Sequence, residues 1–254
     1  MSNGLLTSVK DNAVFVLVSV GIAVALFAIA YGAEKLIKKK NGDTERILST
    51  RKIAMIGVFS AIAMVLHVFD FPVPFAPPFY KLDFSEIPAL IGTFAFGPVA
   101  GIMIEFCKIL LKLVVKGTST AFVGDLANFV VGCSFILPAS IIYTFKKTKK
   151  NAIIASITGT MIMTVFGTMF NAIYLLPTFA TLYGMPLEAI IEMGTKINGN
   201  ITNVTTLVLF AVAPLNLLKG GSVSLVTILV YKKLSPVLKA GSISKKERTV
   251  ETVK

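Results

Sequence analysis

A chain of 254 residues that is 55% hydrophobic and only 15% charged, with a mean hydropathy of +0.81, has too little polar surface for a water-soluble domain. A formal net charge of +12 could indicate a nucleic-acid-binding protein. The basic residues, however, gather in short segments between or after apolar runs, which excludes that interpretation and indicates a membrane protein.

Three basic segments predict how the chain crosses the membrane. Seven Lys and Arg residues lie between Lys35 and Lys52, four form KKTKK at 146–150, and seven follow Tyr231. Such segments remain on the cytoplasmic side and contact lipid headgroups. We therefore expect the linker 34–52 and the C-terminal tail inside the cell, and the N-terminus outside.

The first apolar run, residues 13–33, is long enough for a membrane helix of about 20 residues. The sequence AIA at 28–30 resembles a signal-peptide cleavage site, but the positive cluster follows the run instead of preceding it. We interpret the run as an additional transmembrane helix. Residues 53–69 should then run outward, and the proline-rich loop 70–84 should lie outside without regular helix.

The next stretch, FYKLDFSEIPALIGTFAFGPVAGIMIEFCKIL at 79–110, has charges on both sides of a short apolar run. A single helix over 86–116 would place KKTKK outside, so the chain should turn back at Gly97-Pro98. The first of the two crossings then has about 11 to 14 residues, or roughly 17–21 Å. Since this is shorter than the ~30 Å hydrocarbon core, the crossing must be sheltered by protein.

The remaining crossings are expected at 99–116, 123–145, 151–176 and 201–231, with bends at Pro214 and Gly220-Gly221 in the last. The predicted fold is an all-α integral membrane protein with a six-helix core plus one N-terminal helix. We divide the chain into an N-terminal helix and basic linker (1–50), a six-helix membrane domain (51–238) and a basic cytoplasmic tail (239–254). The number of crossings therefore predicts a multi-pass protein of the cell membrane.

Four segments, in the same order, resemble the riboflavin-specific substrate-binding (S) components of energy-coupling factor (ECF) transporters, over about residues 50–238. They are FYKLDFSEIPALIGTFAFGPVAGIMIEFCKILLK, GDLANFVVGCSFILPASIIYTFKKTKK, NAIYLLPTFATLYGMP and LFAVAPLNLLKGGSVSLVTILVYKKLSP. The additional N-terminal helix and the long outer segment 184–200 depart from the family pattern. The resemblance implies riboflavin as a transported ligand, not a cofactor.

Three polar residues within the apolar crossings are candidates for binding that ligand. Asn216 and Lys219 are three residues apart and so share one helix face, while Asn171 lies in the outer part of another crossing. The uracil-like edge of a flavin presents carbonyl acceptors and one N–H donor, which two Asn and one Lys can match. The resemblance implies the same three residues. The alternatives are interhelical Asn hydrogen bonds and a lysine that extends toward the interface.

The outer loop supplies the other candidates. The resemblance implies that the loop closes over the pocket, with Lys81, Leu82 and Asp83 near the ribityl chain. Alternatively, Asp83 and Glu86 form a capping box at the start of the short helix.

The turn GTSTAFVGDLANF, with Asp125 and Asn128, is a weaker candidate for the pocket wall. Glu105 and Lys108 are expected to form an i,i+3 ion pair.

No sequence feature indicates an enzyme. The chain has no G-x-x-x-x-G-K-[ST] motif, no Ser-His or paired-carboxylate arrangement and no metal-ligand pattern. Uptake would need a partner, and Ala54, Gly57 and Ala61 form a small-residue stripe that either docks a partner helix or packs internally. The resemblance implies a membrane coupling (T) subunit joined to two ATPase subunits. Alternative functions are binding of FMN or another vitamin, or a flavin-releasing or flavin-handing scaffold.

Overall fold

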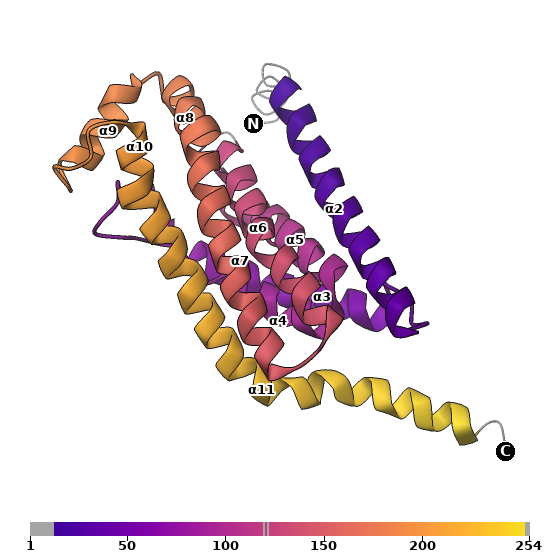
Figure 1. Cartoon of the computed structure of the whole chain (residues 1–254). Helices are drawn as coiled ribbons and strands as arrows, with labels where there is room; N and C mark the ends of the chain where they lie inside the picture. Colours follow the sequence, from indigo (N-terminus) through magenta and orange to yellow (C-terminus); the bar gives the residue numbers. More distant parts are fainter. Residues whose placement is uncertain (1–12, 119, 121, 252–254) are drawn as a thin grey trace.

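The computed structural model describes residues 13–118, 120 and 122–251, with side chains described for 20–118, 120, 122–231 and 233. Residues 1–12 and 252–254, the outermost parts of the predicted N-terminal unit and C-terminal tail, lie outside this range. The elements are α2 (Ala13–Asn41), α3 (Thr50–Val68), β1 (Phe71–Pro72), β2 (Lys81–Leu82), α4 (Glu86–Phe96), α5 (Pro98–Lys116), α6 (Val123–Phe145), α7 (Lys149–Phe170), the π-helix η1 (Asn171–Leu175), α8 (Leu176–Tyr183), α9 (Leu187–Thr195), α10 (Val204–Leu207), the π-helix η2 (Val208–Val212) and α11 (Ala213–Glu251) (Figure 1).

Helices that can cross a membrane make up most of the described chain. Five helical spans are long and apolar enough: 20–41, 50–68, 123–145, 149–183 and 204–231. Helix α4 is apolar but short, and α5 has 19 residues but carries four charged side chains, at 105, 108, 112 and 116. The predicted all-α membrane fold is therefore confirmed, and the two crossings that composition alone describes poorly, α4 and α5, both hold buried charges.

The short helix α4 lies inside the protein, as its length requires. Its 11 residues extend about 16 Å at 1.5 Å per residue, and nine of them are buried. Leu90 and Phe94 belong to a hydrophobic cluster with side chains of α3, α5, α6, α7 and α11. Because protein surrounds α4, the backbone at its ends is not exposed to hydrocarbon.

The turn between α4 and α5 lies at Gly97-Pro98, as predicted. Gly97 has φ +105°, a conformation that glycine adopts without strain, and Pro98 occupies the first turn of α5, where a missing N–H is tolerated. The two helices then pack at close range, since a Cβ at Gly101 would overlap the Thr93 side chain. The chain thus reverses within two residues.

Helix α2 is longer than predicted, because it continues to Asn41 through the first part of the expected linker 34–52. Glu34 is buried there, and its Oε2 accepts a hydrogen bond from the Val99 N–H at 3.0 Å. The first-turn N–H groups of a helix lack internal partners and attract a carboxylate. Lys52 Nζ lies 3.8 Å from Glu34 Oε1, and a Cβ at Gly97 would lie 2.9 Å from the carboxylate. Glu34 therefore anchors α2 to the turn before α5.

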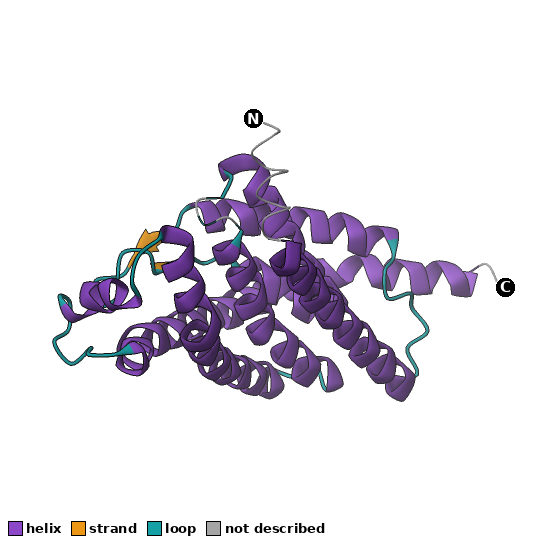
Figure 2. Ribbon diagram, turned by 90° about the horizontal axis from the view of Figure 1, so that it is seen from above, coloured by secondary structure: helices purple, strands orange, loops and turns teal. Residues whose placement is uncertain are grey.

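The outer loop and the C-terminal helix complete the fold. In the loop, β1 and β2 pair antiparallel with Phe71 opposite Leu82, and no helix forms between Phe69 and Ser85. The last apolar span ends at Tyr231, as predicted, but the helix does not, because α11 continues to Glu251 through most of the predicted tail. That final part leaves the bundle and extends across its end (Figures 1 and 2).

Candidate functional site

A lysine in the last crossing meets two acidic residues from the outer loop region. Lys219 Nζ on α11 lies 3.0 Å from Asp83 Oδ2 and 2.9 Å from Glu86 Oε1. Asp83 follows β2 and Glu86 is the first residue of α4, and all three side chains are buried. The loop end and the start of α4 are thereby tied to α11, which is 136 residues from Asp83 in sequence.

A second lysine extends this cluster toward α5. Lys108 Nζ lies 2.6 Å from Glu105 Oε2, which confirms the predicted i,i+3 pair. The same ammonium lies 3.3 Å from Glu86 Oε1 and 3.0 Å from Ser85 Oγ. Glu86 is therefore shared between two lysines. Buried ions of this kind are costly to desolvate, so each depends on its partners remaining in place.

Asp83 does not form the predicted capping box with Glu86. Its Oδ1 accepts the Ser85 N–H at 2.9 Å, and Ser85, the N-cap residue, makes no side-chain capping bond. Its Oδ2 also lies 3.4 Å from His67 Nδ1. Burial raises the pKa of Asp83, but the Lys219 ammonium and His67 outweigh this, and the pKa lies well below its usual range. Charge-assisted bonds to lysine have displaced the cap because they are the stronger interaction.

The two predicted asparagines meet around one glycine of α7. Asn171 Nδ2 donates to the Gly167 carbonyl at 2.8 Å, and its Oδ1 accepts from the Tyr80 hydroxyl at 3.0 Å. A Cβ at Gly167 would lie 2.7 Å from Asn216 Nδ2, so glycine is needed for this approach. Within the described residues Asn216 Nδ2 is buried without a hydrogen-bond partner. The site therefore contains a donor that a ligand acceptor can satisfy.

Both asparagines lie beside π-helical turns. The Leu176 N–H donates to the Asn171 carbonyl, and the Ala213 N–H to the Val208 carbonyl, each five residues back. Prolines follow closely, at 177 and 214, and a proline ring disfavours the regular i→i−4 ladder. Such wide turns are frequent at functional sites. The two prolines were visible in the sequence, but the widened turns were not.

The other three predicted site residues lie in different surroundings. Leu82 is buried in an apolar cluster with Tyr80, Phe179 and side chains of η2. Asn128 is half-buried, and its Oδ1 has no partner among the described residues. Lys81 is not brought to the cluster, since its exposed side chain lies 3.3 Å from Asp70.

Sequence reasoning missed Tyr80, Gly167 and the position of His67 in this site. Tyr80 is buried, and burial raises the pKa of its hydroxyl, which therefore stays protonated as a donor to Asn171. Tyr80 precedes the Lys-Leu-Asp stretch directly, so its proximity to that stretch was an available signal. The contacts of Gly167 and His67 join distant segments and left no local pattern.

The small-residue stripe on α3 faces outward. Ala54, Gly57 and Ala61 are all exposed, and nothing lies within 4 Å of a Cβ built on Gly57. The alternative of internal packing therefore does not describe these three residues. They form a narrow strip on which another helix can approach closely.

Comparisons with known proteins agree with this arrangement. The family "ECF transporter, substrate-specific component" matches residues 51–231. The chain belongs to this family of S components. Among relatives, the riboflavin transporter RibU of Staphylococcus aureus (strain TCH60) is 39% identical over 189 residues, 74% of this chain and 93% of the relative. The riboflavin transporter FmnP of Bacillus subtilis (strain 168) is 30% identical, over 74% and 94%.

A solved structure supports the same assignment. It is described as the S component of a bacterial ECF transporter, and it matches with a TM-score of 0.58 and 38% sequence identity. The match covers 74% of this chain and 98% of that chain. Helix α2 lies before the residues that match the family, so this S component carries its buried Glu34 contact as an addition to the family core.

The shared lysine cluster gives a testable prediction for stability. Lys108→Met keeps the length of the side chain but leaves Glu105 without its partner, so we expect a loss of about 3–5 kcal/mol in unfolding free energy. Lys196→Met removes an exposed pair with Glu192 and should cost about 0–1 kcal/mol. Unfolding of both variants in mixed detergent micelles measures the difference, and equal stabilities would show that the Lys108 cluster does not support the fold.

Proposed function

We propose that this chain is the riboflavin-binding subunit of an ECF vitamin importer. The observation that carries the proposal is the Asn216 amide nitrogen, which is buried without a hydrogen-bond partner among the described residues where α11 meets Gly167 of α7, beside an apolar and aromatic cluster. Three relatives with at least 30% identity are named riboflavin transporters, which supports the same ligand. In this proposal riboflavin binds from the outer side, where the loop 70–84 covers the pocket.

The polar atoms suit the uracil-like edge of the flavin. The Asn216 amide nitrogen can donate to a flavin carbonyl, and its oxygen can accept the flavin N–H. The Lys219 ammonium has three N–H groups, and contacts with Asp83 and Glu86 account for two of them. One N–H then remains for a flavin carbonyl. Asn171 is held by Tyr80 and borders the ring, while Leu82 and Asp83 lie toward the ribityl chain.

A phosphorylated ligand such as FMN fits less well. A phosphate would require cationic side chains at the outer loop, where Lys81 and Lys116 are the candidates. Both already pair with Asp70, at 3.3 and 3.2 Å. A phosphate would have to displace that carboxylate, so the unphosphorylated flavin is the better ligand.

Energy for uptake is proposed to come from partner subunits. The chain has no phosphate-binding P-loop motif for ATP. We propose that a membrane coupling subunit docks on the stripe formed by Ala54, Gly57 and Ala61 and links this chain to two ATPase subunits. The exposed position of the three residues on α3 supports this surface.

Substitutions at the polar edge test the ligand. Asn216→Leu or Lys219→Met should leave a flavin carbonyl unpaired at about 1–3 kcal/mol, which is roughly a 5- to 150-fold loss of riboflavin affinity. Asn216→Asp should lose less than Asn216→Leu, because it keeps an acceptor for the flavin N–H. Quenching of flavin fluorescence measures the Kd, with the exposed Lys150→Met as a control. If Asn216→Leu and Lys219→Met both bind riboflavin like the parent, the pocket lies elsewhere.

A separate substitution tests coupling. Gly57→Leu should abolish riboflavin uptake by cells while the Kd of the purified subunit stays within about twofold of the parent, because the added bulk blocks a partner helix only. Gly221→Leu adds the same bulk at another open helix position and should preserve uptake. If Gly57→Leu transports normally, the stripe is not the docking surface.

A further inference from the structure

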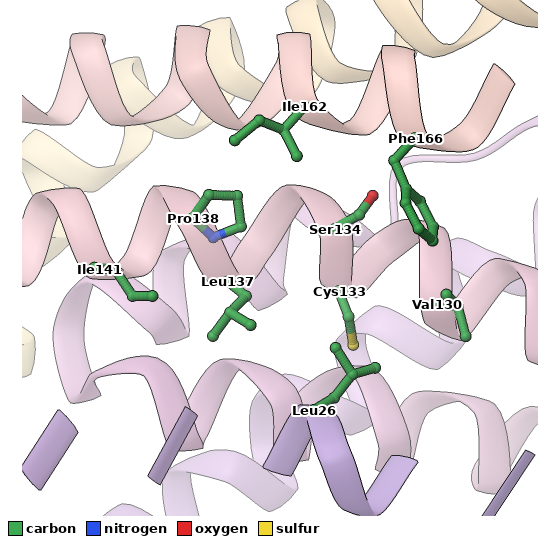
Figure 3. A pocket seen from close by; sticks show the side chains of 9 residues that line it. All are labelled: Leu26, Val130, Cys133, Ser134, Leu137, Pro138, Ile141, Ile162 and Phe166. Carbon is green, nitrogen blue, oxygen red and sulfur yellow. The ribbon is translucent and has the colours of Figure 1, made fainter. Parts of the chain in front are cut away.

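Helix α2 forms one wall of a cavity that lies apart from the predicted ligand-binding residues. The cavity has a volume of about 290 Å³ and lies between α2, α6 and α7 (Figure 3). None of the seven predicted ligand-binding residues lines it. Its walls include Leu26 on α2, Val130, Leu137 and Ile141 on α6, and Ile162 and Phe166 on α7.

The cavity is apolar, even where its lining residues have polar atoms. The Ser134 hydroxyl donates to the Val131 carbonyl at 2.7 Å and is thus engaged within α6. Pro138 has no N–H to offer. Apolar cavities do not hold ordered water. Ile162 and Phe166 are 41% and 38% exposed on the membrane-spanning α7, so the cavity adjoins the hydrocarbon of the bilayer.

The length of the cavity matches the hydrocarbon thickness of one leaflet of the bilayer. Val130 and Ile141 are eleven residues apart on α6, which corresponds to about 16 Å along the helix. Half of the ~30 Å hydrocarbon core is about 15 Å. A helix about 10 Å across and 16 Å long would need roughly 1,200 Å³, far more than the cavity provides. An extended acyl chain suits the space and a partner helix does not.

The end of the cavity at Ile141 lies near several basic residues, which supply a site for a lipid headgroup. Phe145 lies one turn beyond Ile141, and Lys40 Nζ at the end of α2 lies 5.3 Å from the centre of its ring. Lys146, Lys149 and Lys150 follow and are exposed. The nearest acidic residue in sequence to Lys40, Asp43, is paired with Lys38. This end of the cavity therefore favours an anionic group.

We propose that α2, α6 and α7 bind one anionic phospholipid, with an acyl chain in the cavity and the phosphate near Lys40. The lipid belongs to the leaflet on the basic side of the protein. The site depends on α2, which lies outside the residues that match the family and is held in place by Glu34 on Val99. The additional helix thus creates a lipid site that the six-helix core lacks.

Native mass spectrometry of the full chain released from nanodiscs with equal phosphatidylglycerol and phosphatidylethanolamine tests this site. The parent should retain one phosphatidylglycerol. Leu26→Trp fills the cavity and should lower retention at least tenfold. Val24→Trp adds the same ring at a position that is 62% exposed and should behave as the parent.

The charge is tested separately, without changing any packed residue. Lys40→Gln should reduce the preference for phosphatidylglycerol over phosphatidylethanolamine about fivefold. Lys196→Gln makes the same change on an exposed residue between α9 and α10 and should have no effect. Equal retention by Leu26→Trp and Val24→Trp, no retained lipid on the parent, or no preference between the two lipids would each overturn the proposal.

Discussion

The buried contact of Lys219 with Asp83 and Glu86 is the interaction on which the rest of the structure depends. It joins the last crossing to the outer loop and to the short helix α4, and Lys108 extends it into α5. Charges inside a bilayer are tolerated only when they are paired. The outer loop therefore cannot move from α11 without separating a buried ion pair. The same lysine lies three residues after Asn216, whose Nδ2 is unsatisfied, on α11, so loop position and the proposed ligand contacts are linked through one helix.

Local features of the sequence predicted the architecture well, because hydropathy, charge clusters and Gly-Pro turns act over short distances. The reversal at Gly97-Pro98, the sheltered α4 and the Glu105–Lys108 pair are all of this kind. The candidate site was harder to predict from the sequence, because its contacts join residues that are far apart in the chain. Tyr80 meets Asn171 over 91 positions and Asp83 meets Lys219 over 136. A pattern that looks like a helix cap, as at Asp83, cannot show that a lysine far along the chain is the stronger partner.

Helix α2 illustrates how a charged residue can lengthen a membrane helix. The change from apolar residues to EKLIKKK predicted that the helix ends near residue 33, yet Glu34 is buried and bonded to the Val99 N–H. The unpaired N–H groups at the start of α5 provide what a buried carboxylate needs. With α2 fixed at this point, its apolar face and the basic residues at its end lie beside α6, where the proposed lipid binds.

A double-mutant cycle in the ligand-free protein tests the central ion pair most directly. The unfolding free energies of Asp83→Asn, Lys219→Met and the double variant would be compared with that of the parent. Because the two side chains contact each other, we predict an interaction energy of about 1–3 kcal/mol, with the double variant less damaged than the sum of the single variants. Additive losses within about 0.5 kcal/mol would contradict a structure in which Lys219 holds the outer loop through Asp83.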